Sequence, residues 1–382
     1  MIDLRGYFDY AAATPLDPKV KKAMDPYLAD FFYNPSAQYA PARGVNANLK
    51  ALRAEVADIL GAKSTEIIFT SGATEANNLA IYGIMSLFKN ANMIVSGLEH
   101  DSVLKPSQNF NTKICPVNPK GVVDPEVLSK LIDEKTVLVS IMLANNEIGT
   151  IQPIKKIAEI VKEIRHRRQK SGNKIPIYLH TDAAQATNYL DLHVSRLGVD
   201  LMTINGGKIY GPKNSGLLFV RTGIILSPMI LGGGQERGLR SGTESLASIA
   251  GLVQAIKIAS KKREAEKTRL SMLQKHFIDL LEKNITNFAI NASLKNRLPN
   301  NLHVTFYGLD NERIMMKLDS LGFCVAVGSA CSASSDEPSH VLQALGMSEK
   351  DIRASIRFSM GRQTTLQDVE NLVKALKIAV RA

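Results

Sequence analysis

Short apolar runs rich in β-branched residues recur through the first 220 residues, and most are separated by segments long enough for a helix. The runs lie at residues 67–69, 93–95, 137–143, 175–179, 199–204 and 216–220. Parallel strands joined by crossover helices are buried on both faces, so they read as continuous apolar runs rather than as alternating ones. The pattern predicts an α/β fold in which helices cover both faces of a mostly parallel sheet.

The character of the chain changes near residue 244. A proline-free stretch with helical periodicity runs to residue 283 and looks like a connecting helix. After it we expect a strand at 302–306, a helix at 311–318, a Gly/Ser/Ala-rich segment at 327–335, a strand at 355–359 and a helix at 366–380. A chain of 382 residues is long enough for two domains. We therefore predict a large domain at 14–258 and a smaller α+β domain formed by 1–13 and 259–382.

Composition excludes several protein classes. Hydrophobic residues make up 45% of the chain and charged residues 22%, which is typical of a globular protein and not of a disordered or fibrous one. The net charge of +11 favours anionic partners. Basic runs at 165–170 and 261–263 contain few aromatic residues or glycines, so we expect solvated helix ends and no direct nucleic-acid binding.

The cysteines and the start of the chain bear on location. Cys115, Cys324 and Cys331 form neither a disulfide framework nor a paired zinc pattern, so we expect a reducing compartment and no metal site. The first residues carry charges where a signal peptide needs an apolar stretch, and no apolar run approaches the ~20 residues of a membrane span. We expect a cytoplasmic protein that does not enter a membrane.

Three polar clusters fall at expected strand ends, where ligands bind in open parallel sheets. Thr-Ser-Gly-Ala-Thr-Glu at 70–75 opens a helix, and free amides there could bind an anion, although plain helix capping is an equal reading. Asp182 follows an apolar run and could instead be an N-cap; Lys208 lies among glycines and could instead be a surface lysine. Together, in this order, the three clusters favour a site for pyridoxal phosphate, because that cofactor needs a phosphate seat, a carboxylate at its ring nitrogen and a lysine amine.

At this point the sequence resembles the class V branch of fold-type I pyridoxal phosphate enzymes, and within it the cysteine desulfurases. The motifs that carry the resemblance occur in family order over nearly the whole chain. They are Phe-Asp-Tyr-Ala-Ala-Ala-Thr-Pro at 8–15, Asn-Pro-Ser at 34–36, the 70–75 cluster, Glu-His at 99–100, Asn-Asn-Glu-Ile-Gly at 145–149, His-Thr-Asp at 180–182, Arg-Ser-Gly-Thr at 240–243, Gly-Ser-Ala-Cys-Ser at 328–332 and Ser-Ile-Arg-Phe-Ser at 355–359. The resemblance implies a seven-stranded sheet in the large domain. The context of Cys331, followed by Glu-Pro-Ser at 337–339, is similar to the NifS/IscS-like group with a long mobile cysteine loop.

The resemblance also implies the role of each site residue. Lys208 would hold the cofactor as an imine, Asp182 would pair with its ring nitrogen, and His100 would stack on the ring and move protons. Asn146 and Gln185 would bind the phenolic oxygen. Ala73, Thr74 and Asn205 would serve the phosphate, with Thr243 reaching across from the second subunit of a homodimer. Arg357, helped by Asn34, would bind the substrate carboxylate.

Cys331 would take sulfur from the substrate, since it lies in a small-residue segment that leaves the thiol accessible. We expect Cys115 and Cys324 to be small core residues, because both lie in apolar, strand-like runs.

The implied reaction converts L-cysteine to L-alanine and leaves a persulfide on Cys331 for acceptor proteins, such as an iron–sulfur scaffold or a sulfur carrier for tRNA thiolation. The alternatives are a selenocysteine lyase or another class V aminotransferase, and a non-catalytic partner in a sulfur-transfer assembly. Cysteine 331 argues against transamination, which has no use for a thiol.

Two segments depart from the family pattern. The family usually carries Ser-x-His-Lys at the lysine, and this chain has Asn205, Gly206 and Gly207 before Lys208. Loss of one hydrogen bond to a charged phosphate costs roughly 1.5–3 kcal/mol, so we predict weaker cofactor retention. Tyr39 stands about where many relatives have histidine, and the segment at 41–43 looks slightly lengthened.

Overall fold

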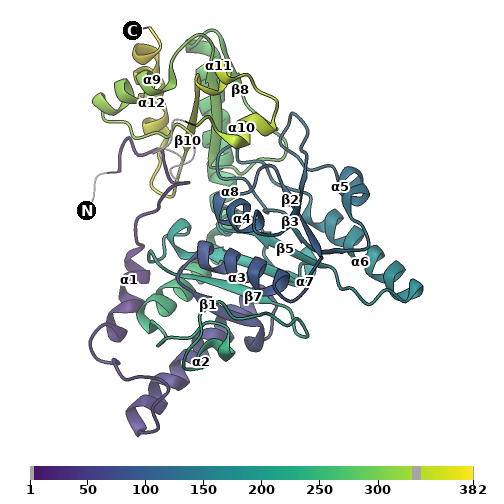
Figure 1. The fold of residues 1–382 in the computed structure, drawn as a ribbon. Coiled ribbons are helices and arrows are strands. Elements are labelled where there is room, and N and C mark those ends of the chain that lie inside the picture. The colour runs from purple at the N-terminus through teal and green to yellow at the C-terminus, as the bar shows by residue number, and fades with distance from the viewer. Residues whose placement is uncertain (1–3, 329–336, 382) are drawn as a thin grey trace.

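A seven-stranded sheet forms the centre of the computed structural model, which describes residues 4–328 and 337–381 (Figure 1). Its strand order is β1-β7-β6-β5-β4-β2-β3. Strand β7 runs antiparallel to β1 and β6, and the other neighbours are parallel, which confirms the mostly parallel sheet. The strands are β1 (Ile67–Thr70), β2 (Asn92–Ser96), β3 (Asn111–Cys115), β4 (Thr136–Ser140), β5 (Tyr178–Asp182), β6 (Leu201–Asn205) and β7 (Gly216–Val220).

Helices pack on both faces of this sheet and build two separate apolar cores. Because successive strand residues point to opposite faces, Ile67 of β1 joins one core and Ile68 joins the other. Helix α3 (Ala73–Met85) fills the core on the Ile68 side. Helices α2 (Ala40–Leu60), α6 (Ile154–Ser171) and the first part of α8 (Leu246–Asn284) fill the other core. The remaining helices here are α1 (Pro18–Met24), α4 (Asp101–Ser107), α5 (Pro125–Leu131) and α7 (Val194–Leu197).

A second, three-stranded antiparallel sheet lies in the last third of the chain, in the order β10-β9-β8. Its strands are β8 (Phe288–Ile290), β9 (Asn301–Phe306) and β10 (Ser355–Ser359), with α9 (Asn311–Ser320), α10 (His340–Ala344), α11 (Glu349–Ile352) and α12 (Leu366–Ala379) around them. Figure 1 shows α8 running from beside the central sheet up to this unit. The expected division at 258/259 falls inside α8 and stays a prediction.

Four local features differ from what the sequence pattern indicated. Strands β3 and β8 were not among the predicted runs; β3 is an edge strand with Ile114 54% exposed, so it lacks a continuous apolar signature. Strand β5 begins at Tyr178, after Pro176, which cannot donate to a ladder. The prediction for Cys115 is confirmed, since it is buried. The prediction for Cys324 is wrong: it is exposed where its segment pairs with Tyr7 at the margin of the smaller unit.

Two features are absent from the described part of the chain. No helix there is long and apolar enough to cross a membrane. No group of three or more His, Cys, Asp and Glu side chains is arranged to hold a metal ion among those residues.

Candidate active site

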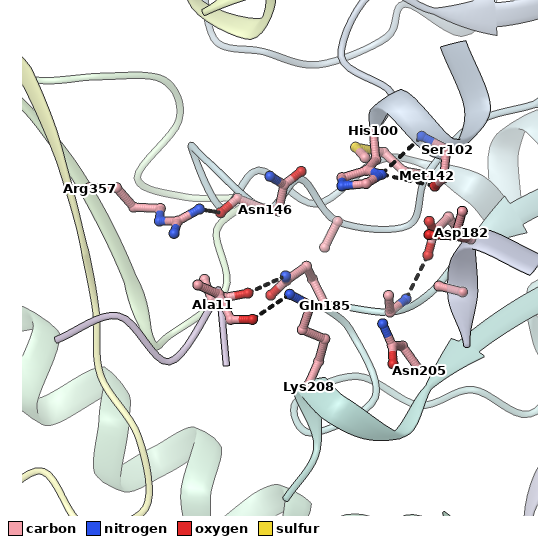
Figure 2. Close-up of a pocket in the computed structure, with 15 residues that line it drawn as sticks. Ala11, His100, Ser102, Met142, Asn146, Asp182, Gln185, Asn205, Lys208 and Arg357 are labelled. Carbon is pink, nitrogen blue, oxygen red and sulfur yellow. Dashed lines mark hydrogen bonds between the residues drawn. The ribbon is translucent and has the colours of Figure 1, made fainter. Parts of the chain in front are cut away.

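A cavity of about 180 Å³ opens where the central strands end, as expected for an open α/β sheet (Figure 2). Asp182 is the last residue of β5 and Asn205 the last of β6, and each places its side chain at the cavity wall. Nine of the expected site residues line this cavity. They are Ala73, Thr74, His100, Asn146, Asp182, Gln185, Asn205, Lys208 and Arg357.

The Asp182 carboxylate is 6% exposed and is held by two donors. Oδ1 accepts from the Ala184 amide at 2.8 Å, and Oδ2 accepts from Asn77 Nδ2 at 2.7 Å. A buried carboxylate needs such partners to stay charged. Each oxygen keeps a further acceptor position, so the group can also receive a proton-bearing nitrogen from the cavity.

Asn77 links this carboxylate to His100. The amide of Asn77, which is fully buried on α3, also donates to Ser102 Oγ at 2.9 Å. Ser102 Oγ lies 2.9 Å from His100 Nδ1, and the Ser102 amide donates to the same nitrogen at 3.0 Å. Because Nδ1 accepts that backbone N–H, the neutral ring carries its proton on Nε2. Sequence reasoning missed Asn77 and Ser102; the available signal was a lone polar residue on an otherwise apolar helix face.

Burial sets the protonation of the two titratable groups at 99 and 100. It lowers the pKa of His100, even though the Asp182 charge acts in the opposite direction. Burial also raises the pKa of Glu99 to about 8, despite hydrogen bonds from Ser96 and the Met142 amide. At pH 7 the imidazole is therefore mostly neutral, and burial favours the protonated form of the Glu99 carboxyl.

Lys208 ends the short helical turn η3 (Gly206–Lys208) that follows β6. Asn205 Oδ1 caps this turn by accepting the Gly207 amide at 3.1 Å, and Lys208 Nζ donates to the Ala12 carbonyl at 2.6 Å. A Cβ at Gly206 would lie 2.1 Å from Ser215 Oγ and 3.2 Å from the Pro212 carbonyl, so a side chain there would force its buried neighbours to shift. A Cβ at Gly207 would meet only the flexible end of Lys213 at 3.3 Å and Asn205 Oδ1 at 3.6 Å, so a side chain has room.

The start of α3 offers an anion seat. Gly72, the N-cap of α3, supplies no side-chain cap, and Ala73 and Thr74 of the first turn line the cavity. Unpaired amides and the helix dipole favour a phosphate at such a position. An anion seat, the amine of Lys208 and the carboxylate of Asp182 are the groups that pyridoxal 5′-phosphate requires, so the residues present fit this cofactor.

Arg357 lies on the opposite side of the cavity from Asp182 (Figure 2). Its side chain is 1% exposed; Nη2 donates to Asp9 Oδ1 at 2.6 Å and Nη1 to the Asn146 carbonyl at 3.1 Å. Between Arg357 and Asp182, Gln185 Nε2 donates to the Ala11 carbonyl at 3.0 Å (Figure 2). A guanidinium facing into a cavity of this kind suits a carboxylate-bearing ligand.

Of the three remaining expected site residues, two are described by the structure and do not line the cavity. Asn34 is exposed, and its Oδ1 accepts the Ser36 amide. Thr243 is exposed and lies outside the cavity of its own chain. Cys331 lies outside the described residues. Tyr39, at the departure noted in the sequence, is 54% exposed.

Comparison with known proteins gives consistent matches. The model of the family "Aminotransferase class-V" matches residues 6–372. A cysteine desulfurase IscS of Dictyoglomus turgidum is 42% identical over 378 residues, covering 97% of this chain and 93% of that protein. Cysteine desulfurase IscS 1 of Archaeoglobus fulgidus is 39% identical over 377 residues, covering 97% of this chain and 95% of that protein.

Two solved structures are also similar over most of their length. A NifS-like protein has a TM-score of 0.89 at 31% identity, with 98% of both chains covered. SspA in complex with cysteine has a TM-score of 0.80 at 35% identity, covering 93% of this chain and 98% of that one. The chain therefore belongs to the aminotransferase class-V family and, within it, to the cysteine desulfurases.

Proposed function

We propose that this chain uses pyridoxal 5′-phosphate to convert L-cysteine to L-alanine and leaves the sulfur as a persulfide on Cys331. The observation that carries the proposal is one cavity that unites the amine of Lys208, the buried carboxylate of Asp182 and the guanidinium of Arg357. The similarity to proteins named cysteine desulfurase, and to a structure holding cysteine, supports this reaction over a selenocysteine lyase or an aminotransferase.

The cavity residues divide the work of holding the cofactor. Lys208 would attach it through its amine, Asp182 would keep its ring nitrogen protonated, and the first turn of α3 would bind its phosphate with help from Asn205. Asn146 and Gln185 would contact the phenolic oxygen. When bound, the cofactor supplies an electron sink for negative charge that develops at the substrate α-carbon.

The protein's own groups would bind the substrate and move its protons. Arg357 would bind the substrate carboxylate and so fix which bond at the α-carbon faces Lys208. The Lys208 amine would take the α-proton and return it. His100, whose neutral ring holds its proton at Nε2, can donate that N–H at the cavity wall, because its other nitrogen already accepts the Ser102 amide.

Sulfur transfer would then use Cys331. Its thiolate attacks the substrate sulfur, the carbon–sulfur bond of the substrate breaks, and a sulfur–sulfur bond forms on the enzyme. One cysteine and one enzyme thiol thus give one alanine and one enzyme persulfide, with no external oxidant. Acceptor proteins, such as an iron–sulfur scaffold or a sulfur carrier for tRNA thiolation, would regenerate the thiol. A thiol renewed at each turnover suits a reducing compartment such as the cytoplasm.

A homodimer is part of this proposal. Large apolar side chains are exposed in two segments, including Phe32 (71%) in one and Ile225 (74%) and Leu231 (79%) in the other. Exposed apolar groups of this kind favour association. Thr243, which lies outside its own cavity, would serve the phosphate of the other subunit. Sedimentation analysis of the holoenzyme tests this directly, and a monomer at micromolar concentration would contradict it.

The decisive experiment follows both products in single-cysteine variants. The protein is incubated with L-cysteine, and alanine and protein-bound persulfide are measured for the wild type, Cys331→Ser and the control Cys324→Ser. We expect Cys331→Ser to lose the persulfide and keep the visible absorption band, and Cys324→Ser to behave as wild type. Lys208→Ala should lose the band. Persulfide on the Cys331→Ser variant would refute the assignment.

A further inference from the structure

We propose that Asp9 is the internal counter-ion of the substrate-binding arginine and limits how tightly the enzyme holds amino-acid carboxylates. The inference rests on the proposed role of Arg357 in binding the substrate carboxylate. Asp9 is thus a positioning residue that acts through Arg357. It lies in the 8–15 motif, which matched the family pattern without implying a role for Asp9.

Backbone pairing delivers Asp9 to Arg357. The segment containing Asp9 pairs in parallel with the end of β10, where the Ser359 amide donates to the Phe8 carbonyl at 2.7 Å. Ser359 Oγ also accepts the Ala11 amide at 2.9 Å. Arg357 lies two residues earlier on the same strand. These hydrogen bonds hold the backbone on both sides of Asp9 beside β10, which places the Asp9 side chain within reach of Arg357.

The contact leaves Arg357 able to bind a second carboxylate. Asp9 uses one oxygen on Nη2, at 2.6 Å, and the Asn146 carbonyl takes Nη1. Among the described residues, Nε has no acceptor although it is buried. A guanidinium has five N–H donors, so a single-oxygen contact does not saturate it. Substrate therefore need not displace Asp9; the two carboxylates can share the guanidinium.

Sharing weakens the attraction for substrate. The Arg357 side chain is 1% exposed and that of Asp9 19%, so water screens the pair poorly. The substrate carboxylate therefore approaches an Arg357–Asp9 pair with no net charge, and the Asp9 carboxylate repels it, whereas an unpaired Arg357 would only attract it. L-Cysteine and L-alanine carry the same carboxylate, so Asp9 loosens both. Weak binding of alanine lets product leave, at the cost of a higher KM for cysteine.

The test is Asp9→Asn, which keeps an acceptor oxygen for Nη2 and removes the charge. We expect KM for L-cysteine and the inhibition constant of L-alanine to fall together by about tenfold, without a rise in kcat. A purely structural role would move KM in the opposite direction. Asp17→Asn is the matched control, because Asp17 forms a similarly shielded pair with Arg362 at 3.2 Å outside the cavity. It should leave both constants unchanged.

A second neutral variant and an arginine variant make the outcome decisive. Asp9→Ser should reproduce the fall in both constants, and circular dichroism and thermal melting verify that each variant is folded. Unchanged or raised constants in a folded Asp9→Asn or Asp9→Ser enzyme overturn the proposal. Arg357→Gln should raise KM strongly. If it does not, the role of Arg357 fails; if it does and the Asp9 variants bind no tighter, only the role of Asp9 fails.

Discussion

Replacement of Asn77 by alanine should impair catalysis although Asn77 does not line the cavity. The Asn77 amide is fully buried and donates both to Asp182 Oδ2 at 2.7 Å and to Ser102 Oγ at 2.9 Å. It thereby fixes the carboxylate that would keep the cofactor nitrogen protonated and the serine that orients His100. Asn77→Ala removes both restraints at once.

The magnitude follows from these contacts. A hydrogen bond to a charged group contributes about 1.5–3 kcal/mol, and each 1.36 kcal/mol in an activation barrier is about tenfold in rate. If the Asp182 contact matters mainly in the transition state, kcat should fall by about 10- to 150-fold. The buried partners also lose a donor, so the free energy of unfolding should fall by about 1–3 kcal/mol.

The assay measures alanine formation at saturating L-cysteine, at a temperature well below the melting transition. Asn78→Ala is the control: Asn78 is the neighbouring asparagine on α3, and its amide donates to the Thr74 main-chain carbonyl within the same helix instead of to Asp182 or Ser102. We expect the control to keep kcat within about twofold. A folded Asn77→Ala enzyme with wild-type kcat would refute the argument that this amide orients Asp182 and His100.

Three further outcomes are expected. The Gly207→His variant, which needs only a small shift of Lys213, should slow cofactor release about tenfold. Release is measured as the loss of visible absorbance on dilution. A rate of release no slower than that of the wild type would contradict this prediction. Burial lowers the pKa of His100 below its usual 6.5. Activity that needs the neutral ring should therefore persist below pH 6.5 and decline as the pH falls through the lowered pKa. A kcat/KM profile with its acid midpoint above pH 6.5 would be inconsistent with this expectation. Burial also lowers the pKa of His180 and of His303 to about 3, so each favours folding fully above pH 6.5, and the free energy of unfolding should decrease as pH falls from 6.5 toward 3. Urea midpoints that do not fall over this range would contradict the burial argument.

Several elements were predictable from local pattern, and others were not. Strands buried on both faces, such as β2 and β6, were recognisable as continuous apolar runs, and α8 was recognisable as a long stretch with helical periodicity and no proline. Edge strand β3 was not predicted, because a partly exposed strand does not have a continuous run of apolar residues. Cys324 was expected to be buried from its apolar neighbours, yet it is exposed, because burial depends on what packs over a residue and not on the residues beside it in the chain.

The α/β class, the family and the residue types at the ends of β5 and β6 could be inferred from the residues alone, because these depend on short-range pattern and on motif order. The contacts between distant groups became visible only in the folded chain, where Asn77 joins Asp182 to Ser102 and Asp9 pairs with an arginine 348 residues away. A charged or polar residue in the sequence implies that its side chain needs a hydrogen-bond or ionic partner if it is buried, but it does not identify that partner. Which partner satisfies it is settled when the strands pair and bring distant segments together.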